Sequence, residues 1–335
     1  MKAILYTKYG SPDVLQLREV EKPTPKADQV LVKVQAASAN ALDFRRFEMQ
    51  SALGRFMDEV LLKTVNKVLG ADIAGRVEAV GVAVKQFQPG DEVYGLSAGS
   101  VGAFAEYACA AEDNLALKPA NLSFEQAAAV PVAALTALQA LRDKGHIQSG
   151  QKILINGASG GVGTFAVQLA KVFGAEVTAV CSTRNLDMVR QLGAAHVIDY
   201  TKEDFTKNGQ RYDLIAAING NHSIQDYRRA LNPNGIYVAV GGSISQVLQG
   251  LFLGPVVSKI GSKKMGFMGI AKVSNKDLAF MNVFLEAGKV GPVIDRGYPL
   301  SETAEAIRYL VQEHAKGKVV ITVQQTSNSQ PRRDD

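Results

Sequence analysis

The pattern of hydrophobic and polar residues divides the chain into two kinds of structure. In the first 120 residues, extended segments such as "QVLVKVQAAS" place Val30, Val32 and Val34 on one face, and "PGDEVYG" gathers turn residues before a short apolar run. A period of two is typical of β-strands with one buried face. This part is therefore predicted to be β-rich, with a partly helical excursion over residues 45–68.

The second kind of structure begins with an alanine-rich run from Ser123 to Gly145. Ser123 is a suitable N-cap, the alanines have high helix propensity, and Gly145 can end the helix. From Lys152 onward, strand-length apolar runs alternate with segments of helical period. The pattern predicts a connecting helix, followed by an α/β domain with a doubly wound parallel sheet of the Rossmann type.

The last patterned stretch, "ETAEAIRYLVQEHAKGKVVITV", predicts a helix, a glycine turn and a strand. The alternation has ended by then, so this piece is expected to return to the β-rich part. The predicted domains are 1–122 with 296–326, discontinuous in sequence, and 123–295. Residues 327–335 have almost nothing apolar to bury and are predicted to be a disordered tail.

Composition narrows the function classes. The 335 residues are 47% hydrophobic with a net charge of +5, but the basic residues are scattered and have no interleaved aromatic platform, so nucleic-acid binding is not expected. Cys109 and Cys181 are too few for a disulfide framework, and the N-terminus lacks a signal-peptide core, so a cytoplasmic location is expected.

Residues 247–265 are apolar but too short and interrupted for a membrane span. A buried helix or a loop at a subunit interface is the preferred interpretation, with a substrate-channel wall or an interfacial anchor as alternatives.

The stretch "INGASGGVG" carries the strongest chemical signal. A strand, "KILIN", leads into Ala158-x-Gly160-x-x-Gly163, a helix follows, and a second strand ends about 20 residues later. Gly160 and Gly161 would let backbone N–H groups approach a pyrophosphate, the helix N-terminus would stabilise its charge, and Gly163 would allow close packing. The fingerprint predicts a dinucleotide site. The expected loop contacts are Ser159, Gly160, Gly161, Val162 and Gly163.

The end of the second strand indicates which dinucleotide is bound. A carboxylate there would favour NADH, whereas this chain has Cys181, Ser182, Thr183 and Arg184. Hydroxyl groups and a guanidinium are anion ligands, so Ser182, Thr183 and Arg184 are expected to hold a 2′-phosphate. NADPH is the predicted cofactor.

With these motifs in place, the chain resembles the zinc-independent, zeta-crystallin-like quinone oxidoreductase branch of the medium-chain dehydrogenase/reductase superfamily, over residues 1 to 325. The matching stretches are "LGADIAGRVEAVG", "FQPGDEVYG", "FAEYACA", "AAAVPVAALTAL", "NGASGGVGTFAVQLAK", "LGAAHVIDY" and "GKVVITV". The resemblance implies a GroES-like domain joined to a Rossmann domain, NADPH in the cleft between them, and a homodimer.

The resemblance also implies roles for residues outside the glycine loop. Asn40 and Asp43 are expected to line the cleft near the nicotinamide as catalytic residues. Purely structural roles remain alternatives: a capped turn for Asn40 and Asp43, and a hydroxyl bonded to its own helix backbone for Thr136. Further cofactor contacts are implied at Thr136, Tyr200, Gly241, Gly242 and Lys318.

The departures from the family pattern bear on the chemistry. At the positions of the zinc ligands of zinc-dependent relatives, this sequence has Asn40 and Ala71, so no metal is expected. Without a Lewis acid, a conjugated acceptor is the easier substrate because hydride addition leaves a delocalised enolate. The predicted function is NADPH-dependent reduction of quinones or α,β-unsaturated carbonyls. A non-catalytic NADPH-binding protein and a trans-acting enoyl reductase of lipid or polyketide synthesis are the alternatives.

Overall fold

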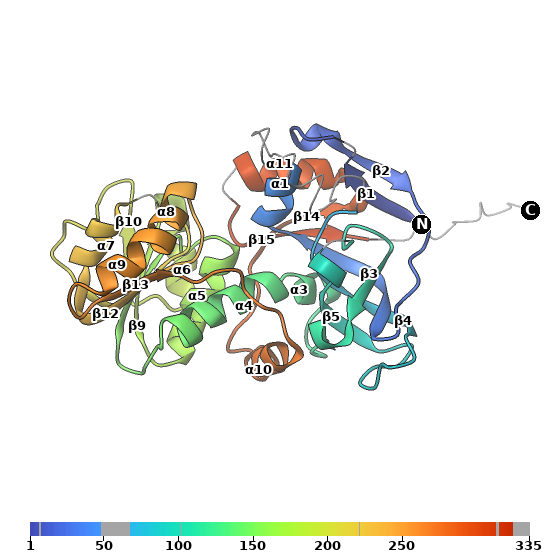
Figure 1. The fold of residues 1–335 in the computed structure, drawn as a ribbon, viewed down its shortest axis with the longest axis horizontal. Helices are drawn as coiled ribbons and strands as arrows, with labels where there is room; N and C mark the ends of the chain where they lie inside the picture. Colours follow the sequence, from blue (N-terminus) through green and yellow to red (C-terminus); the bar gives the residue numbers. More distant parts are fainter. Residues whose placement is uncertain (7, 48–67, 101, 221, 313–314, 324–335) are drawn as a thin grey trace, which may run out of the picture.

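The computed structural model describes residues 1–6, 8–47, 68–100, 102–220, 222–312 and 315–323. Its strands form a two-stranded, a six-stranded and a seven-stranded sheet. Figure 1 shows the six-stranded sheet with its helices at one end of the molecule and the seven-stranded sheet at the other, with α4 between them. The predicted tail at 327–335 and most of the predicted excursion at 45–68 lie outside the described residues.

The six-stranded sheet is parallel throughout and has the order β10-β9-β8-β11-β12-β13. This is the strand order of dinucleotide-binding folds, in which the order reverses beside the first strand. The strands are β8 (Lys152–Asn156), β9 (Glu176–Cys181), β10 (His196–Asp199), β11 (Tyr212–Ala217), β12 (Leu231–Ala239) and β13 (Lys264–Phe267). The helical elements are α5 (Gly161–Val172), η6 (Thr183–Asn185), α6 (Leu186–Gln191), α7 (Ile224–Arg229), α8 (Ile244–Leu248), the π-helical turn η7 (Gln249–Leu253) and α9 (Gly254–Ser258). The predicted Rossmann architecture is confirmed.

Both faces of this sheet are covered, as its sequence pattern requires. Ile153 and Ile155 of β8 pack in one apolar cluster, and Leu154 between them packs in another. Successive strand side chains point to opposite faces, so an unbroken apolar run is the signature of a strand buried on both sides.

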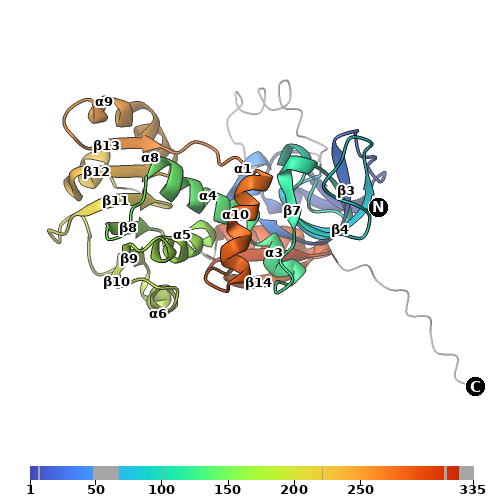
Figure 2. The ribbon, with the colours of Figure 1, turned by 90° about the horizontal axis from the view of Figure 1, so that it is seen from below.

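The seven-stranded sheet runs β14-β15-β3-β4-β5-β7, with β6 pairing β3. Val30, Val32 and Val34 share one core cluster, as their spacing predicts. The elements of this part are β1 (Lys2–Tyr6), η1 (Pro12–Val14), β2 (Leu15–Glu19), β3 (Gln29–Ala39), α1 (Ala41–Phe47), β4 (Asp72–Val80), β5 (Glu92–Leu96), η3 (Ala98–Ser100), β6 (Tyr107–Ala111), η4 (Glu112–Asn114), β7 (Leu115–Leu117), β14 (Ile294–Pro299), η8 (Leu300–Glu302), α11 (Thr303–Gln312) and β15 (Lys318–Thr322). Figure 2 shows the last, red segments of the chain among the blue and cyan first ones.

The pairing of β15 with both β14 and β3 places the end of the chain in this sheet. Because β14 begins at Ile294, the domain boundary predicted after residue 295 falls inside that strand. The strand was missed in the sequence because "IDRGYP" mixes polar residues, glycine and proline, and only partly buries its side chains.

The predicted connecting helix is wrong in one detail. It consists of α3 (Phe124–Ala128), α4 (Pro131–Gln139) and a π-helical turn, η5 (Ala140–Lys144). Pro131 cannot donate a backbone hydrogen bond to a preceding turn, so it starts a new helix instead of continuing the first. Ser123 caps α3 with a reciprocal bond to Gln126, as expected.

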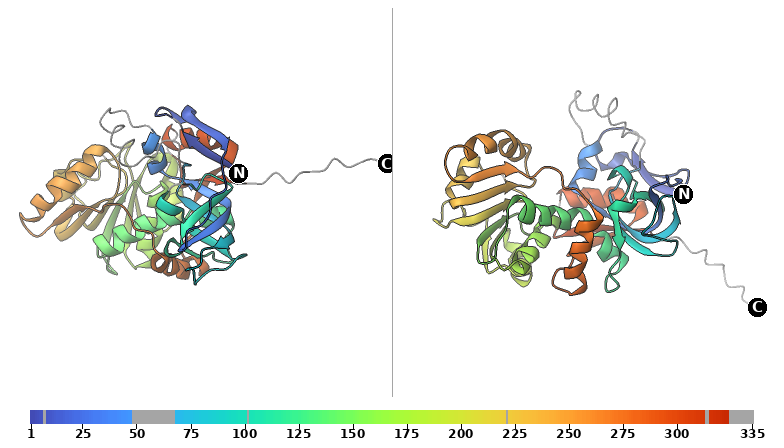
Figure 3. Two further views of the ribbon diagram at one scale, coloured as in Figure 1. Left: turned by 45° about the vertical axis from the view of Figure 1, so that its right-hand side comes forward. Right: turned by 60° about the horizontal axis from the view of Figure 1, so that its bottom comes forward.

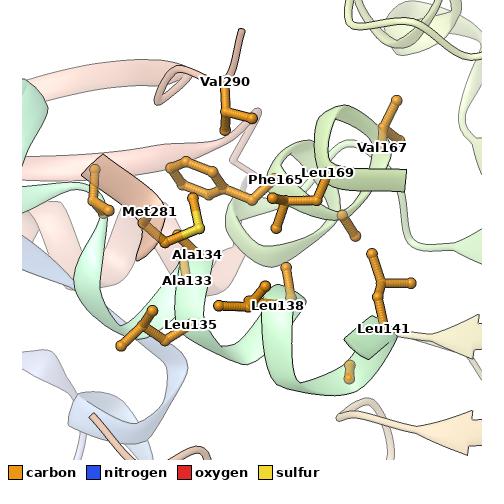
Figure 4. Close-up of a cluster of buried hydrophobic side chains, with 14 of the residues drawn as sticks. Ala133, Ala134, Leu135, Leu138, Leu141, Phe165, Val167, Leu169, Met281 and Val290 are labelled. Atoms are coloured by element: carbon orange, nitrogen blue, oxygen red, sulfur yellow. The ribbon is translucent and has the colours of Figure 1, made fainter. Parts of the chain in front are cut away.

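An apolar interface surrounds α4. Phe165 and Leu169 of α5 lie beside Leu138 of α4 and Met281 of α10 (Asn275–Glu286), as Figure 4 shows. The same cluster includes Tyr94 of β5, so the core is continuous between the two large sheets. Figure 3 shows α10 beside α4, between the two parts.

The segment 247–265 is not a buried helix, which was one of the two preferred interpretations; the other, a loop at a subunit interface, stays a prediction. It forms the end of α8, the π-helical turn η7, α9 and the start of β13, and Phe252 is 65% and Val256 56% exposed. No helix among the described residues combines the length and apolarity that a membrane span requires.

Candidate functional site

The glycine loop joins the carboxyl end of β8 to the N-terminus of α5. Gly157, with φ of 89°, makes the tight turn, so Ala158 can stand where the fingerprint has its first glycine. A Cβ on Gly163 would lie 2.1 Å from the carbonyl O of Gly157. That glycine is therefore required by packing between the helix and the loop.

Gly160 differs from Gly163. Its φ of −83° and ψ of 177° suit any residue, and an added Cβ would have no atom within 4 Å. It is the N-cap of α5, with no side-chain cap, so it leaves the first N–H groups of a twelve-residue helix for another acceptor. Nothing in the described protein explains a glycine here, whereas an anionic ligand lying against the backbone would.

The loop is in contact with the start of β15. Gly317 N donates to Ser159 O at 2.9 Å, and Gly160 and Gly317 form a β-bridge. A Cβ on Gly161 would lie 2.9 Å from Cδ of Lys318, so this lysine runs along the loop. The predicted residues Ser159, Gly160, Gly161 and Lys318 are thus together.

Lys318 ends in a buried polar cluster with Ser38, Asn40 and Asp72. Its Nζ donates to Asn40 Oδ1 at 2.6 Å and to Asp72 Oδ2 at 3.2 Å. Lys318 is 3% and Asp72 0% exposed. Strand register produces this meeting, because Ser38 pairs with Asp72 across β3 and β4, and Val319 pairs with Ala39 across β15 and β3.

The carboxylate of Asp72 is fully hydrogen-bonded. Its Oδ2 also accepts from Ser38 Oγ at 2.6 Å and Asn40 Nδ2 at 3.0 Å, and its Oδ1 accepts from the backbone N of Val132 at 2.9 Å. Val132 lies in the first turn of α4, so Asp72 also meets the positive end of that helix. All four partners are donors, so both carboxylate oxygens act as acceptors.

Two of the three ammonium hydrogens of Lys318 are accounted for by these bonds. In the described residues no further acceptor contacts this Nζ. The cluster therefore contains a buried Lys318–Asp72 ion pair with one available ammonium donor beside the glycine loop. Asp72 was missed in the sequence; an acidic residue inside the apolar strand "ADIAG" was the available signal.

The two predicted catalytic residues have structural contacts. Asn40 is half-buried and its amide is held at both ends, by Ser38, Asp72 and Lys318. Buried Asp43 accepts a hydrogen bond from the Asn40 backbone N at 2.8 Å, at the start of α1. Asp43 thus makes the capped turn that was the alternative for it, and this turn orients Asn40.

The residues predicted to hold a 2′-phosphate lie at the carboxyl ends of β9 and β10. Ser182 is half-buried, Arg184 is exposed, and Tyr200 is 58% exposed. Thr183 donates its hydroxyl proton to Asp199 Oδ2 at 2.5 Å. That bond, with further bonds from Thr201, holds the pKa of Asp199 below its ordinary value. The Asp199 carboxylate at this edge was not anticipated.

A second buried polar group lies at the ends of β8 and β12. Asn156 Nδ2 donates to Tyr227 Oη at 3.0 Å, and Tyr227 donates to Gln246 Oε1 at 3.3 Å. Gln246 Nε2 donates to Gly241 O at 2.7 Å. Gly242 has a φ of 93°, which favours glycine. The network supports the turn containing the predicted residues Gly241 and Gly242, and nothing in the sequence pattern marks Gln246.

Thr136 is half-buried on α4. Tyr94 is fully buried and donates to Asn282 Oδ1 at 2.6 Å. Burial raises its pKa well above the ordinary value, so this hydroxyl group holds its proton. In the described residues, no group of three or more histidine, cysteine or acidic side chains could hold a metal.

Comparison with known proteins identifies relatives of this chain. Residues 26–120 match the alcohol dehydrogenase GroES-like domain, and residues 192–321 match a zinc-binding dehydrogenase family. The chain is 40% identical to 2-methylene-furan-3-one reductase of Solanum lycopersicum over 96% of this chain and 79% of that protein. It is 37% identical to the chloroplastic NADPH-dependent alkenal/one oxidoreductase of Arabidopsis thaliana, with the same coverage. The quinone oxidoreductase of Coxiella burnetii superposes with a TM-score of 0.85, at 32% identity, over 97% of this chain and 99% of that one.

Proposed function

Because the chain belongs to the medium-chain dehydrogenase/reductase superfamily, among its quinone oxidoreductases, we propose that it is an NADPH-dependent reductase of quinones or α,β-unsaturated carbonyls. One observation carries the proposal: Gly160 faces open space at the uncapped N-terminus of α5 although its backbone does not require glycine. A bound pyrophosphate would explain it.

The same loop would hold the cofactor through backbone N–H groups of residues 160–163, where the partial positive charge of α5 is concentrated. Ser182 and Arg184 would bind the 2′-phosphate, with Tyr200 beside it. Thr183 would act by holding Asp199, since its hydroxyl proton is already donated there.

NADPH, when bound, would supply the hydride. We assign Lys318 to the cofactor because its aliphatic part lies along Gly161. Asn40 would fix the position of the ammonium through its 2.6 Å bond. Asp43 and Ser38 would position Asn40 and Asp72, and Thr136, Gly241 and Gly242 would shape the pocket wall.

The reaction is proposed to proceed without zinc. Asn40 occupies one expected ligand position, and the ammonium of Lys318 lies 2.6 Å from its amide oxygen. A divalent cation at this place would meet a fixed positive charge. The carboxylate of Asp72 is already occupied by four donors.

The proposal is tested by following NADPH oxidation, with a metal chelator present, against quinones, alkenals, enones and saturated aldehydes. We expect turnover of the conjugated acceptors, undiminished by chelator and much slower with NADH. Activity confined to saturated aldehydes and abolished by chelator would contradict it. Tight NADPH binding without turnover would favour a binding protein, and turnover of acyl thioesters alone would favour an enoyl reductase.

We further propose that the GroES-like part, 1–122 with 296–326, and the Rossmann part, 123–295, act as two domains, and that the chain forms a homodimer. The outer edge of β13 has no partner strand among the described residues. Beside it lies an apolar surface formed by Leu248, Leu251, Phe252, Leu253 and Val256, each at least 47% exposed. Light scattering after size exclusion measures the mass. A cytoplasmic location stays a prediction.

A further inference from the structure

A pocket unrelated to the glycine loop opens at the amino-terminal edge of the six-stranded sheet. Its volume is about 470 Å³. It lies where β11 and β12 begin, at the end of the molecule that carries α7 and β12 in Figure 1. The cofactor loop is at the opposite, carboxyl-terminal edge, a strand length of roughly 20 Å away. The lining residues are Thr206, Lys207, Gly209, Gln210, Arg211, Gln225, Arg228, Arg229, Ala230 and Lys263.

The charged lining is entirely positive, because all five of its charged residues are lysine or arginine. Two of them have acidic neighbours: Lys207 Nζ lies 3.3 Å from Asp204, and Arg229 pairs with Asp226. Arg211, Arg228 and Lys263 form no ion pair with any acidic group that the structure describes. Three cations without counter-charge in one pocket are unfavourable until an anion binds.

Backbone contacts hold two of these cations in place. Arg228 Nη2 donates to Ile260 O at 3.1 Å, and Lys263 Nζ donates to the backbone O of Arg228 at 2.7 Å. Nε of Arg228 is buried without a hydrogen-bond partner among the described residues. Burial, together with the positive charges of Arg211 and Arg228, lowers the pKa of Lys263. The pocket therefore holds its cations in fixed positions. The buried Nε of Arg228 has no acceptor, and Arg211, Arg228 and Lys263 have no acidic partner, among the described residues.

We propose that this pocket binds a phosphate monoester group. Two guanidinium groups and an ammonium match the charge and the several oxygen acceptors of such a dianion. The phosphate could belong to a soluble metabolite or to an anionic lipid headgroup. Ile260, whose backbone O accepts a hydrogen bond from Arg228, is 64% exposed, and residues 259–264 contain three lysines and no acidic residue.

The test measures binding of inorganic phosphate and glycerol phosphate by calorimetry, with NADPH present to fill the cofactor loop and ionic strength held constant. R211Q and K263Q are each expected to weaken binding about tenfold, since each removes a charge-assisted contact. R211Q loses no side-chain hydrogen bond or ion pair of the described structure, so weaker binding by this variant would not be explained by misfolding. K272Q removes an exposed positive charge outside the pocket and should leave affinity unchanged.

A parallel experiment measures co-sedimentation with phosphatidylcholine vesicles that contain phosphatidic acid. Arg211-dependent binding to vesicles alone assigns the pocket to a lipid headgroup, and Arg211-dependent binding of glycerol phosphate assigns it to a soluble ligand. No binding in either experiment, or an equal loss in R211Q and K272Q, would overturn the proposal.

Discussion

Two of the contacts between the parts that carry the large sheets differ in chemistry. Around α4, apolar side chains of α5, α10 and β5 pack in one core. Between the glycine loop and β15, the contact is polar: Gly317 bonds Ser159, and Lys318, which lies along Gly161, is held by Asp72 and Asn40 of its own part. The first contact resembles an ordinary domain core, whereas the second contains a buried ion pair beside the site proposed for the cofactor.

The difference indicates a division of roles. Apolar packing stabilises without directional requirements, whereas a buried ion pair gains little net stability because both ions lose hydration. A cluster with four donors on one carboxylate is therefore better explained by the orientation it gives Lys318. Separate substitutions in the two contacts can test this division.

The largest effect is expected from Asp72→Asn. The change leaves the Lys318 ammonium buried without a countercharge and should lower the free energy of unfolding by about 3 to 5 kcal/mol. Urea denaturation measures it. Combining Asp72→Asn with Lys318→Met removes both charges and should recover part of the stability while NADPH affinity stays low. Equal stability of the single and double variants would show that the ion pair carries no such penalty.

Leu138→Ala tests the apolar contact. Leu138 is fully buried against α5 and α10, so the cavity should cost about 3 kcal/mol of unfolding free energy. Because the change is on the apolar side, the KM for NADPH of the folded enzyme should not move. A raised KM with unchanged stability would contradict the division between the two contacts.

The glycine loop allows a comparison of matched substitutions. Gly163→Ala places a methyl group 2.1 Å from a backbone oxygen and should cost about 1 to 3 kcal/mol of stability. Gly160→Ala meets no atom within 4 Å and should leave stability within about 0.5 kcal/mol, yet weaken NADPH binding. Thermal unfolding without cofactor and fluorescence titration with NADPH separate the two. Unchanged NADPH affinity in Gly160→Ala would remove the main support for the cofactor site.

The sequence predicted the parts of the fold in which local pattern and final structure agree. The apolar run "KILIN" and the glycines that follow it predict β8 and the loop, because each requirement is local. β13 and β14 could not be predicted, since "KMGF" and "IDRGYP" contain no apolar run and owe their conformation to pairing with β12 and β15.

The candidate site was predicted less completely for the same reason. Asn40 and Lys318 are 278 residues apart and meet only through the register of β3 and β15. The role of Asp72 depends on donors from β3, β15 and α4, which no single stretch of sequence contains. Gln246 is polar in a segment of ordinary composition, so its burial could not be foreseen.

The smallest expected effect is on acid stability and concerns Thr183. Its hydroxyl group is the main cause of the lowered pKa of Asp199 in the folded state. A lowered carboxyl pKa stabilises the fold above the unfolded-state pKa, and this contribution is lost as pH falls through the folded-state pKa. In Thr183→Val the folded-state pKa should rise, so the variant should lose stability relative to the wild type near neutral pH and approach it in acid. Urea denaturation from neutral pH down to about pH 3 measures this difference.

Thr322→Val is the matched control, since that hydroxyl donates to a backbone carbonyl and its loss should have the same cost at every pH. If the stability difference between Thr183→Val and the wild type does not change with pH, the hydroxyl group does not lower the pKa of Asp199.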